Sequence, residues 1–424
     1  MKSFRFIHTG DIHLDSPLKG LTGQEGPAAE RIRTATRAAF ENLVTRAIEE
    51  DVTFMIIAGD LYDGDWRDFQ TGLFFVRQMG RLAQVGVPVF LLYGNHDAES
   101  QITKRLSLPD NVHVFSSRKP QTLTLNGYDI ALHGQSFRQR DITENLVPDY
   151  PAPVSGAFNI GVLHTGLGGM GDHANYAPCT LDDLVNKGYQ YWALAHVHQA
   201  AILCENPHIV FCGNLQGRHI RETGTKTAYL VNVEQGEIDE ISPLDAGVVC
   251  WHQLSVPIEG CRGLGDIVDR IRAAIEGAVA TETGGRLLAC RIELTGKSEL
   301  HGQLMGSTEH LLAECRALAL GLGDEVAWIE RVVISSEPID VLSGVASGKD
   351  AIADLQSFLA QASTDSDLLE QFGSEFGDLI RKLPHEARLE IDDPFLKAAI
   401  DGNYARITGL AGTYLSARLA KERA

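Results

Sequence analysis

Seven side chains of the kinds that bind metal ions follow the predicted strands of this chain. Each lies at or just beyond the end of an apolar stretch that is rich in β-branched and aromatic residues. Open α/β sheets place their chemistry at such strand ends. Oxygen and imidazole ligands without thiolates suit pairs of Mn²⁺, Fe²⁺ or Zn²⁺ better than Ca²⁺. The candidate metal ligands are Asp11, His13, Asp60, Asn95, His164, His196 and His198.

Asp60 is the natural bridge between two ions. It follows a predicted strand within the segment Gly59-Asp-Leu-Tyr-Asp63. A carboxylate shared by two ions holds them about 3.5–4 Å apart, where they activate a water and stabilise both oxygens of a phosphoryl displacement. A β-turn capped by Asp60 is the plain alternative.

The segment Gly94-Asn-His-Asp97 carries three chemical functions in a row. Asn95 can supply a metal ligand, His96 a proton, and Asp97 a carboxylate that fixes the tautomer of the proton donor. A plain turn is the alternative. The matching ligands at four other strand ends favour the functional interpretation.

The order of the predicted elements indicates a parallel sheet with right-handed crossovers. Strands are predicted over residues 4–8, 53–58 and 87–93, and helices over residues 34–50 and 69–84. Further strands are expected before His164 and before His196. Side chains two residues apart leave an extended chain on the same side, so we expect His196 and His198 to point together, as Asp11 and His13 do.

The chain of 424 residues is too long for a single core. A composition shift near Leu244 marks a boundary, and beyond it the pattern predicts a compact βαβαβ unit. After Pro338 the chain is helical in character, and these helices either pack on their own domain or dock on a partner. We therefore expect three parts, which are residues 1–245, 246–336 and 337–424.

The composition limits the classes of partner. The formal net charge of −19 is unusual for a protein that binds DNA unaided, because neutralising phosphates supplies much of the affinity for DNA. The seven cysteines form no Cys-x-x-Cys pair, which argues against a thiolate zinc site. No apolar stretch reaches the roughly 18 residues that a membrane span needs, so we expect a soluble, cytoplasmic protein.

The series Asp-x-His, Gly-Asp, Gly-Asn-His-Asp, a lone His and His-x-His resembles the calcineurin-like metallophosphoesterase superfamily in order and spacing. Within that superfamily, residues 13–17, 59–63 and 213–219 resemble the SbcD/YhaO branch of DNA repair exonucleases. The resemblance implies an α/β fold: a sandwich of mixed sheets flanked by helices, followed by a small α/β capping domain and a helical tail.

The resemblance also implies roles for the residues. One ion would be held by Asp11, His13, Asp60 and His198, and the other by Asp60, Asn95, His164 and His196. His96 would be the catalytic histidine, which protonates the leaving oxygen or binds the scissile phosphate, and Asp97 would orient it. Mn²⁺ is the expected metal, with Fe²⁺, Zn²⁺ and Mg²⁺ as alternatives. Arg218 and His219 could bind phosphate, against the alternatives of a surface salt bridge and a structural histidine.

These observations favour a dinuclear metal-dependent phosphodiesterase that hydrolyses DNA, as an exonuclease or endonuclease subunit in DNA repair. The resemblance implies a partner, an SMC-like coiled-coil ATPase of the SbcC/YhaN type, which would supply the DNA-binding surface that this acidic chain lacks. A homodimer is a further option. One alternative is a stand-alone metallophosphoesterase for nucleotides or other small phosphoesters. Another is a catalytically silent scaffold, which failure to bind metal would reveal.

Overall fold

The computed structural model describes residues 2–16, 26–64, 69–99, 107–125, 127–168, 175–339, 358, 361–362, 364–382 and 394–421. The chain forms two compact units. The first contains Met1–His252, Ala278–Cys290 and Leu322–Trp328. The second contains Gln253–Gly277, Arg291–Gly321 and Ile329–Ala424.

The first unit holds two six-stranded sheets. In one of them the strand order is β12-β11-β1-β2-β3-β4. Strands β1 to β4 pair in parallel, whereas β11 pairs antiparallel with both β1 and β12. The carboxyl ends of the parallel strands therefore meet at one edge. The bounds are β1 Phe4–Thr9, β2 Phe54–Ile57, β3 Val89–Leu91, β4 Val112–Val114, β11 Thr227–Glu234 and β12 Glu237–Asp245.

The other sheet has the order β5-β6-β7-β8-β10-β9. Its four central strands are parallel, and β5 and β9 pair antiparallel at the two edges. The strand β9 has no counterpart among the sequence predictions, because its residues are only half-buried or exposed. The bounds are β5 Gln121–Leu125, β6 Ile130–Gly134, β7 Phe158–His164, β8 Tyr191–Ala195, β9 Ala201–Glu205 and β10 His208–Phe211.

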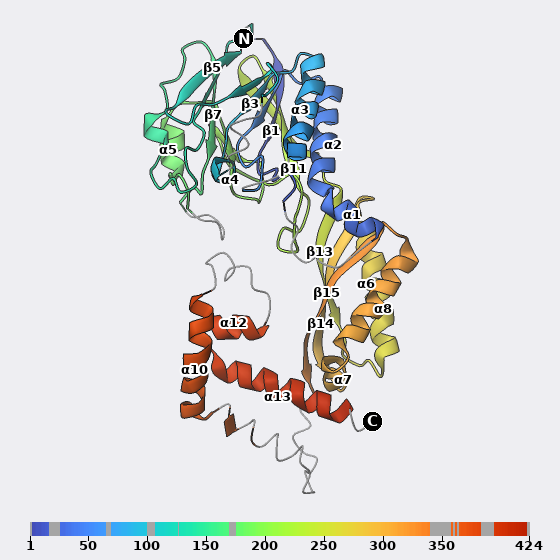
Figure 1. Cartoon of the computed structure of the whole chain (residues 1–424). Coiled ribbons are helices and arrows are strands. Elements are labelled where there is room, and N and C mark those ends of the chain that lie inside the picture. The colour runs from blue at the N-terminus through green and yellow to red at the C-terminus, as the bar shows by residue number, and fades with distance from the viewer. Residues whose placement is uncertain are drawn as a thin grey trace. The chain divides into compact units, whose positions relative to one another are not determined.

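Helices and sheets of this unit are stacked in layers (Figure 1). The helices α2 (Ala35–Glu49) and α3 (Phe69–Gln84) share a hydrophobic core with the first sheet. An aromatic core lies between the two sheets, where the rings of Phe6 and Phe54 stack 4.9 Å apart. On the outer side of the second sheet, α5 (Leu181–Asn186) joins a third core. The predicted fold class, mixed sheets flanked by helices, is confirmed.

Local sequence explains where the helices lie. The helix α3 has the bounds predicted from its apolar spacing, and it buries Phe75, Met79 and Leu82 along one face. The helix α5 begins with a capping box in which Thr180 and Asp183 each bond the other's backbone N–H. A short helix, α1 (Pro27–Arg33), precedes α2 and was not predicted.

The rest of the chain contains a three-stranded sheet and six helices among the described residues. The sheet has the order β13-β14-β15, and the predicted βαβαβ succession is present with one extra helix, α7. The bounds are β13 Val249–Pro257, α6 Leu264–Thr281, β14 Leu287–Ser298, α7 His301–Met305, α8 Thr308–Leu322 and β15 Ala327–Pro338.

The C-terminal helices follow, with α10 at Ser366–Arg381, α12 at Pro394–Ile400 and α13 at Tyr404–Lys421. Within the second unit α13 contacts α7, α10 and α12. Helix α13 therefore packs on its own unit, which is one of the two roles that the sequence suggests for the C-terminal helices. Residues 340–357, 359–360, 363, 383–393 and 422–424 of the predicted helical segment lie outside the described residues.

Two glycines test how tightly the first unit is packed. A Cβ on Gly161 would lie 2.2 Å from Cε3 of Trp192, and the buried Trp192 is fixed by a 3.0 Å bond from its Nε1 to the Leu184 carbonyl. A Cβ on Gly80 in α3 would meet no atom within 4 Å. We expect Gly161→Ala to lower the free energy of unfolding by about 1–3 kcal/mol.

The matched control is Gly80→Ala, which should be neutral or stabilise the helix by up to about 1 kcal/mol. Urea unfolding monitored by tryptophan fluorescence measures both changes. Equal midpoints for Gly161→Ala and the unmodified protein would contradict the packing described for β7 and β8.

Candidate metal centre

Four of the seven candidate ligands have a left-handed backbone. Asp11, His13, Asp60 and His196 have φ angles of +45°, +48°, +49° and +101°. Positive φ is uncommon for residues other than glycine and is concentrated at functional sites. The expectation that Asp11 and His13 stand in an extended segment is therefore wrong. Their side chains converge because both residues turn out of the strand direction.

Backbone hydrogen bonds hold the loops after β1 and β2 together. The Asp11 N–H donates to the Gly59 carbonyl at 3.0 Å, and the N–H groups of Ile12 and His13 donate to the Asp60 carbonyl at 2.9 and 3.0 Å. The parallel pairing of the two strands thus continues into their loops. As a result, Asp11, His13 and Asp60 are fixed relative to one another.

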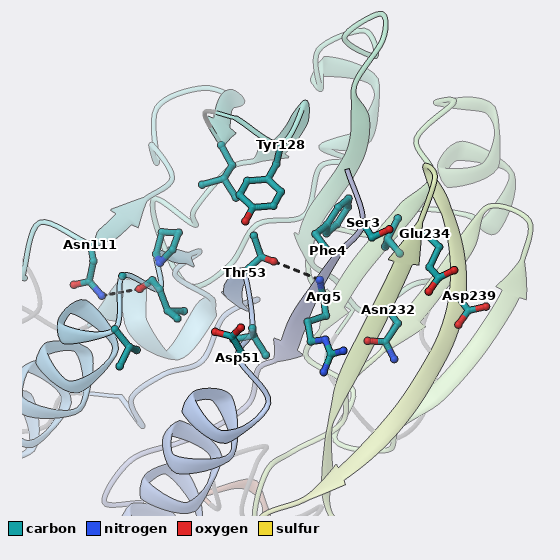
Figure 2. Close-up of a pocket in the computed structure, with 17 residues that line it drawn as sticks. Ser3, Phe4, Arg5, Asp51, Thr53, Asn111, Tyr128, Asn232, Glu234 and Asp239 are labelled. Atoms are coloured by element: carbon teal, nitrogen blue, oxygen red, sulfur yellow. Dashed lines mark hydrogen bonds between the residues drawn. The ribbon is translucent and has the colours of Figure 1, made fainter. Parts of the chain in front are cut away.

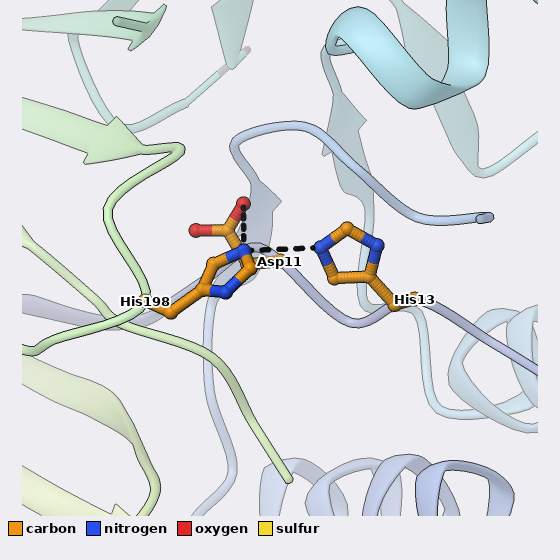
Figure 3. A group of neighbouring side chains, drawn as sticks. All are labelled: Asp11, His13 and His198. Atoms are coloured by element: carbon orange, nitrogen blue, oxygen red, sulfur yellow. Dashed lines mark hydrogen bonds and ion pairs between the residues drawn. The ribbon is translucent and has the colours of Figure 1, made fainter. Parts of the chain in front are cut away.

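Asp11, His13 and His198 form the first group of ligands (Figure 3). The two Nε2 atoms of His13 and His198 face each other at 3.2 Å, and the His198 Nε2 lies 4.0 Å from Oδ1 of Asp11. Among the described residues, the buried Oδ1 of Asp11 has no hydrogen-bond partner. A cation at the centre of this group would satisfy that oxygen and accept the imidazole lone pairs.

Asp60, His164 and His196 form the second group, and Asp60 also lies with His13 and His96 in an overlapping set. The His164 Nε2 lies 3.3 Å from Oδ2 of Asp60 and 2.9 Å from Oδ1 of Asn95, so Asn95 joins this group. The same Asp60 oxygen lies 3.9 Å from Nε2 of His13 in the first group. The structure thus brings all seven predicted ligands together, with Asp60 between the two groups.

Burial and mutual charge set the protonation of these side chains. Burial raises the pKa of Asp11 to about 7, and burial lowers the pKa of His13 to about 4, with the charge of Arg218 lowering it further. Burial alone would lower the pKa of His164, but the Asp60 carboxylate raises it to about 9. Buried carboxylates beside imidazoles form a donor set that fits a pair of divalent metal ions.

His96 contacts a carboxylate other than the predicted one. Its Nδ1 lies 3.0 Å from Oδ1 of Asp63, and the same Asp63 oxygen lies 3.6 Å from Nδ1 of His13. The side chain of His96 is 31% exposed, whereas that of His13 is completely buried, so His96 is the more accessible imidazole. The prediction that Asp97 orients His96 is therefore corrected, because Asp63 makes that contact.

Asp97 has a structural task instead. Its carboxylate accepts hydrogen bonds from three backbone N–H groups, those of Leu61 at 3.2 Å, Tyr62 at 2.9 Å and Gly94 at 2.9 Å. These bonds join the loop after β2 to the loop after β3. Asp97 thereby positions Asp60 and Asn95 indirectly, through the backbone that carries them.

Two further residues of the centre escaped the sequence analysis as site residues, namely Asp63 and Glu222. Glu222 is buried, and its Oε1 lies 2.8 Å from Nδ1 of His198 and 2.9 Å from Nη2 of Arg218. Arg218 thus forms an ion pair, which was one of its two alternatives, but the pair lies in the interior and not on the surface. The sequence contains two weak signals for these residues. Asp63 belongs to the segment 59–63 that carries the resemblance described above, and Glu222 follows Arg218 by four residues.

A hollow of about 910 Å³ lies at the end of β1 and β2 opposite the candidate metal centre (Figure 2). Its lining includes Arg5, Asp51, Tyr128 and Glu234. Nη1 of Arg5 already donates to the Glu50 carbonyl at 3.2 Å. None of the candidate ligands lines this hollow, which is therefore separate from the candidate metal centre.

Comparison with known proteins agrees with this geometry. Residues 4–200 match the calcineurin-like phosphoesterase family, and residues 251–337 match the middle domain of the metallophosphoesterase YhaO. The uncharacterized metallophosphoesterase YhaO of Bacillus subtilis is 40% identical over 263 residues, which are 61% of this chain and 64% of that protein.

More distant similarity extends to proteins named DNA double-strand break repair protein Mre11. The one from Methanopyrus kandleri is 25% identical over 214 residues, covering 46% of this chain and 44% of that protein. The one from Sulfurisphaera tokodaii is 24% identical over 212 residues, covering 47% and 50%. The chain thus spans less than two thirds of the length of these three curated relatives.

Among solved structures, a crystal structure of a dimetal phosphatase from Danio rerio superimposes with a TM-score of 0.35 at 10% identity, covering 55% of this chain and 94% of that one. Within the described part of the chain, no helix is both long enough and apolar enough to cross a membrane.

Mutations can distinguish the role of Asp63, which contacts His96, from that of Asp97, which binds backbone N–H groups. Asp63→Asn should slow phosphoester hydrolysis by about 10- to 100-fold, because the His96 ring loses its anionic partner. His96→Ala should slow hydrolysis by about 10² to 10⁴-fold while both ions stay bound.

Asp97→Asn should lower the melting temperature, since one amide oxygen cannot accept three N–H bonds. Hydrolysis of bis(p-nitrophenyl) phosphate, metal analysis and thermal unfolding measure these effects.

If Asp97→Asn slowed hydrolysis as much as His96→Ala at unchanged melting temperature, the original assignment of Asp97 would be right. Loss of metal from His96→Ala in proportion to activity would make His96 a ligand.

Proposed function

We propose, on the premise that the chain belongs to the calcineurin-like metallophosphoesterase family, that it hydrolyses phosphodiester bonds of DNA with two divalent metal ions. The observation that carries the proposal is Asp60, whose carboxylate lies 3.3 Å from Nε2 of His164 and 3.9 Å from Nε2 of His13. One carboxylate between two groups of imidazole and oxygen donors suits a two-ion site for phosphoryl displacement.

When bound, the two ions supply positive charge that stabilises the phosphoryl transition state and lowers the pKa of an attacking water. The protein residues hold the reacting groups in place. The His96 backbone N–H donates to Oδ1 of Asp60 at 3.0 Å, which fixes the helix α4 (Asn95–Glu99) at the centre. His96 itself is accessible, and the Asp63 carboxylate at its Nδ1 stabilises the imidazolium form, which carries a second proton on Nε2 and can give it to the leaving oxygen or donate it to a phosphate oxygen.

DNA as the substrate rests on the similarity to the Mre11 proteins, whose names assign them to double-strand break repair. The net charge of −19 favours nucleotides or other small phosphoesters as the alternative, because such substrates need no extended basic surface. For the metal we propose Mn²⁺, with Fe²⁺, Zn²⁺ or Mg²⁺ as alternatives that share the same donors. We also place the protein in the cytoplasm, where such a nuclease would meet DNA.

An acidic nuclease needs a partner that binds DNA, and we propose an SMC-like coiled-coil ATPase of the SbcC/YhaN type. Helix α10 offers the apolar surface that suits a coiled coil. Its Leu369, Phe372 and Phe376 are only half-buried, and the rings of Phe372 and Phe376 lie 6.4 Å apart. Leu379 on the same helix is 53% exposed.

The substrate proposal is tested by a panel of single-stranded DNA, duplex DNA and small phosphoesters, each with Mn²⁺, Mg²⁺ and Zn²⁺. We expect DNA to be hydrolysed with Mn²⁺, and Asp60→Ala to abolish hydrolysis and reduce bound metal, because both groups lose their common carboxylate. Hydrolysis of small phosphoesters alone would favour the alternative substrate. Full metal content and turnover in Asp60→Ala would contradict the two-ion assignment.

The partner proposal is tested by co-expression with the ATPase followed by size-exclusion chromatography. Leu379→Glu should abolish the complex, since it places a charge in the apolar surface of α10. The matched control is Leu320→Glu on α8, because Leu320 is also exposed, at 64%, and belongs to the same unit. A complex that survives Leu379→Glu, or one lost equally in Leu320→Glu, would show that α10 is not the docking surface.

A further inference from the structure

Glu222 is a buried carboxylate that touches a ligand histidine without belonging to either ligand group. We infer that Glu222 is a positioning residue that fixes the tautomer of His198, so that the lone pair for the metal ion of the first group lies on its Nε2. The inference rests on the proposed two-ion centre and deepens it, because it assigns an outer carboxylate to one ion.

The geometry around His198 places its two ring nitrogens in different surroundings. The Nδ1 lies 2.8 Å from Oε1 of Glu222. On the other side of the ring, the Nε2 lies 3.2 Å from Nε2 of His13 and 4.0 Å from Oδ1 of Asp11. A neutral imidazole has one N–H and one lone pair, so a proton on Nδ1 leaves the lone pair on Nε2, among the other ligands.

A competing tautomer exists, and Glu222 opposes it. The Nη2 of Arg218 lies 3.3 Å from Nδ1 of His198 and can only donate a hydrogen bond. If Nδ1 accepted that bond, the proton would move to Nε2 and the lone pair needed by the metal would be lost. A carboxylate can only accept, so the shorter contact to Glu222 requires the proton on Nδ1. The same Oε1 also accepts from Nη2 of Arg218 at 2.9 Å, which draws the guanidinium away from His198.

Glu222 is itself held rigidly. Its Oε2 accepts hydrogen bonds from the Arg218 backbone N–H at 2.7 Å and from Nδ2 of Asn214 at 2.9 Å. The loop that carries these residues is tied to the start of β13, since Nε1 of Trp251 donates to the Gly217 carbonyl at 2.8 Å. A carboxylate with this many fixed donors has one orientation, which is what setting a tautomer requires.

The second group lacks this arrangement at His164. There the Nδ1 faces the backbone carbonyl of Ala58 at 3.2 Å, a neutral acceptor that forms part of the main chain. The tautomer of His164 is therefore set by the backbone and does not depend on Glu222. Removal of the Glu222 carboxylate should weaken one of the two ions and spare the other.

The experiment is a Zn²⁺ titration by calorimetry on the full chain and on Glu222→Gln and Glu222→Ala. We expect the unmodified protein to bind two ions, and each variant to bind one ion unchanged and the other about 10- to 100-fold more weakly. Glu222→Gln should have the smaller effect, because an amide oxygen can still accept the Nδ1 proton. In the Zn²⁺-loaded protein labelled with ¹⁵N-histidine, long-range ¹H–¹⁵N spectra should show His198 protonated at Nδ1.

The matched control is Glu330→Gln. Glu330 is another poorly exposed carboxylate paired with an arginine, since it accepts from Nε and Nη2 of Arg291 at 2.7 Å each, and it belongs to the second unit. This control should bind both ions as tightly as the unmodified protein. Should Glu222→Ala fail to fold, the binding and the spectrum of Glu222→Gln decide.

Equal affinities for both ions in Glu222→Gln and the unmodified protein, or an Nε2-protonated His198, would overturn the inference. If the unmodified protein bound fewer than two ions, the proposed centre itself would fail. If DNA were not hydrolysed but Glu222→Gln lost one ion selectively, the role of Glu222 would stand and only the proposed substrate would be wrong.

Discussion

The centre depends on Asp60, whose backbone and side chain both form contacts with the other residues of the site. Its carbonyl accepts the N–H groups of Ile12 and His13, its Oδ1 accepts the N–H of His96, and its Oδ2 faces His164. Loops after three strands of one sheet and one strand of the other therefore meet at a single residue. Burial raises the pKa of this carboxylate, but the nearby imidazoles of His164 and His96 lower it well below its usual range. Asp60 is thus anionic where two cations are needed.

The backbone around Asp60 explains how short strands place so many polar side chains in one interior. Gly59 has a φ of +117°, and a Cβ there would lie 2.4 Å from Nδ1 of His164. A Cβ on Gly94 would lie 2.3 Å from Oδ1 of Asp60. Only glycine lets these two loops approach the ligands so closely. The left-handed residues Asp11 and Asp60 cost conformational energy, which the surrounding hydrogen bonds offset.

The ligands at the strand ends could be predicted, because the strand and the motif that follows it are neighbours in the sequence. The residues that hydrogen-bond to these ligands could not be predicted, because those contacts join distant segments of the chain. The partner of His96 was expected at Asp97, its sequence neighbour, but is Asp63, which is 33 positions away and comes from a different loop. The backbone conformation at Asp11 was also misjudged, because a positive φ leaves no periodic signal in the sequence. Fold class was easier, since it depends on the many buried positions that the apolar strands share.

The charges of the centre connect its chemistry to the acidity of the whole chain. Arg218, a cation whose Nη2 lies 3.3 Å from Nδ1 of His198, lies 2.9 Å from Glu222 and 3.9 Å from Asp63. Its charge is therefore largely offset by carboxylates before any phosphate arrives. Attraction for a phosphodiester must come mainly from the two ions and from His96, because the chain as a whole carries a formal net charge of −19. Substrate binding in this protein therefore depends on metal binding. The carboxylates that hold the ions also determine how strongly a phosphate is bound.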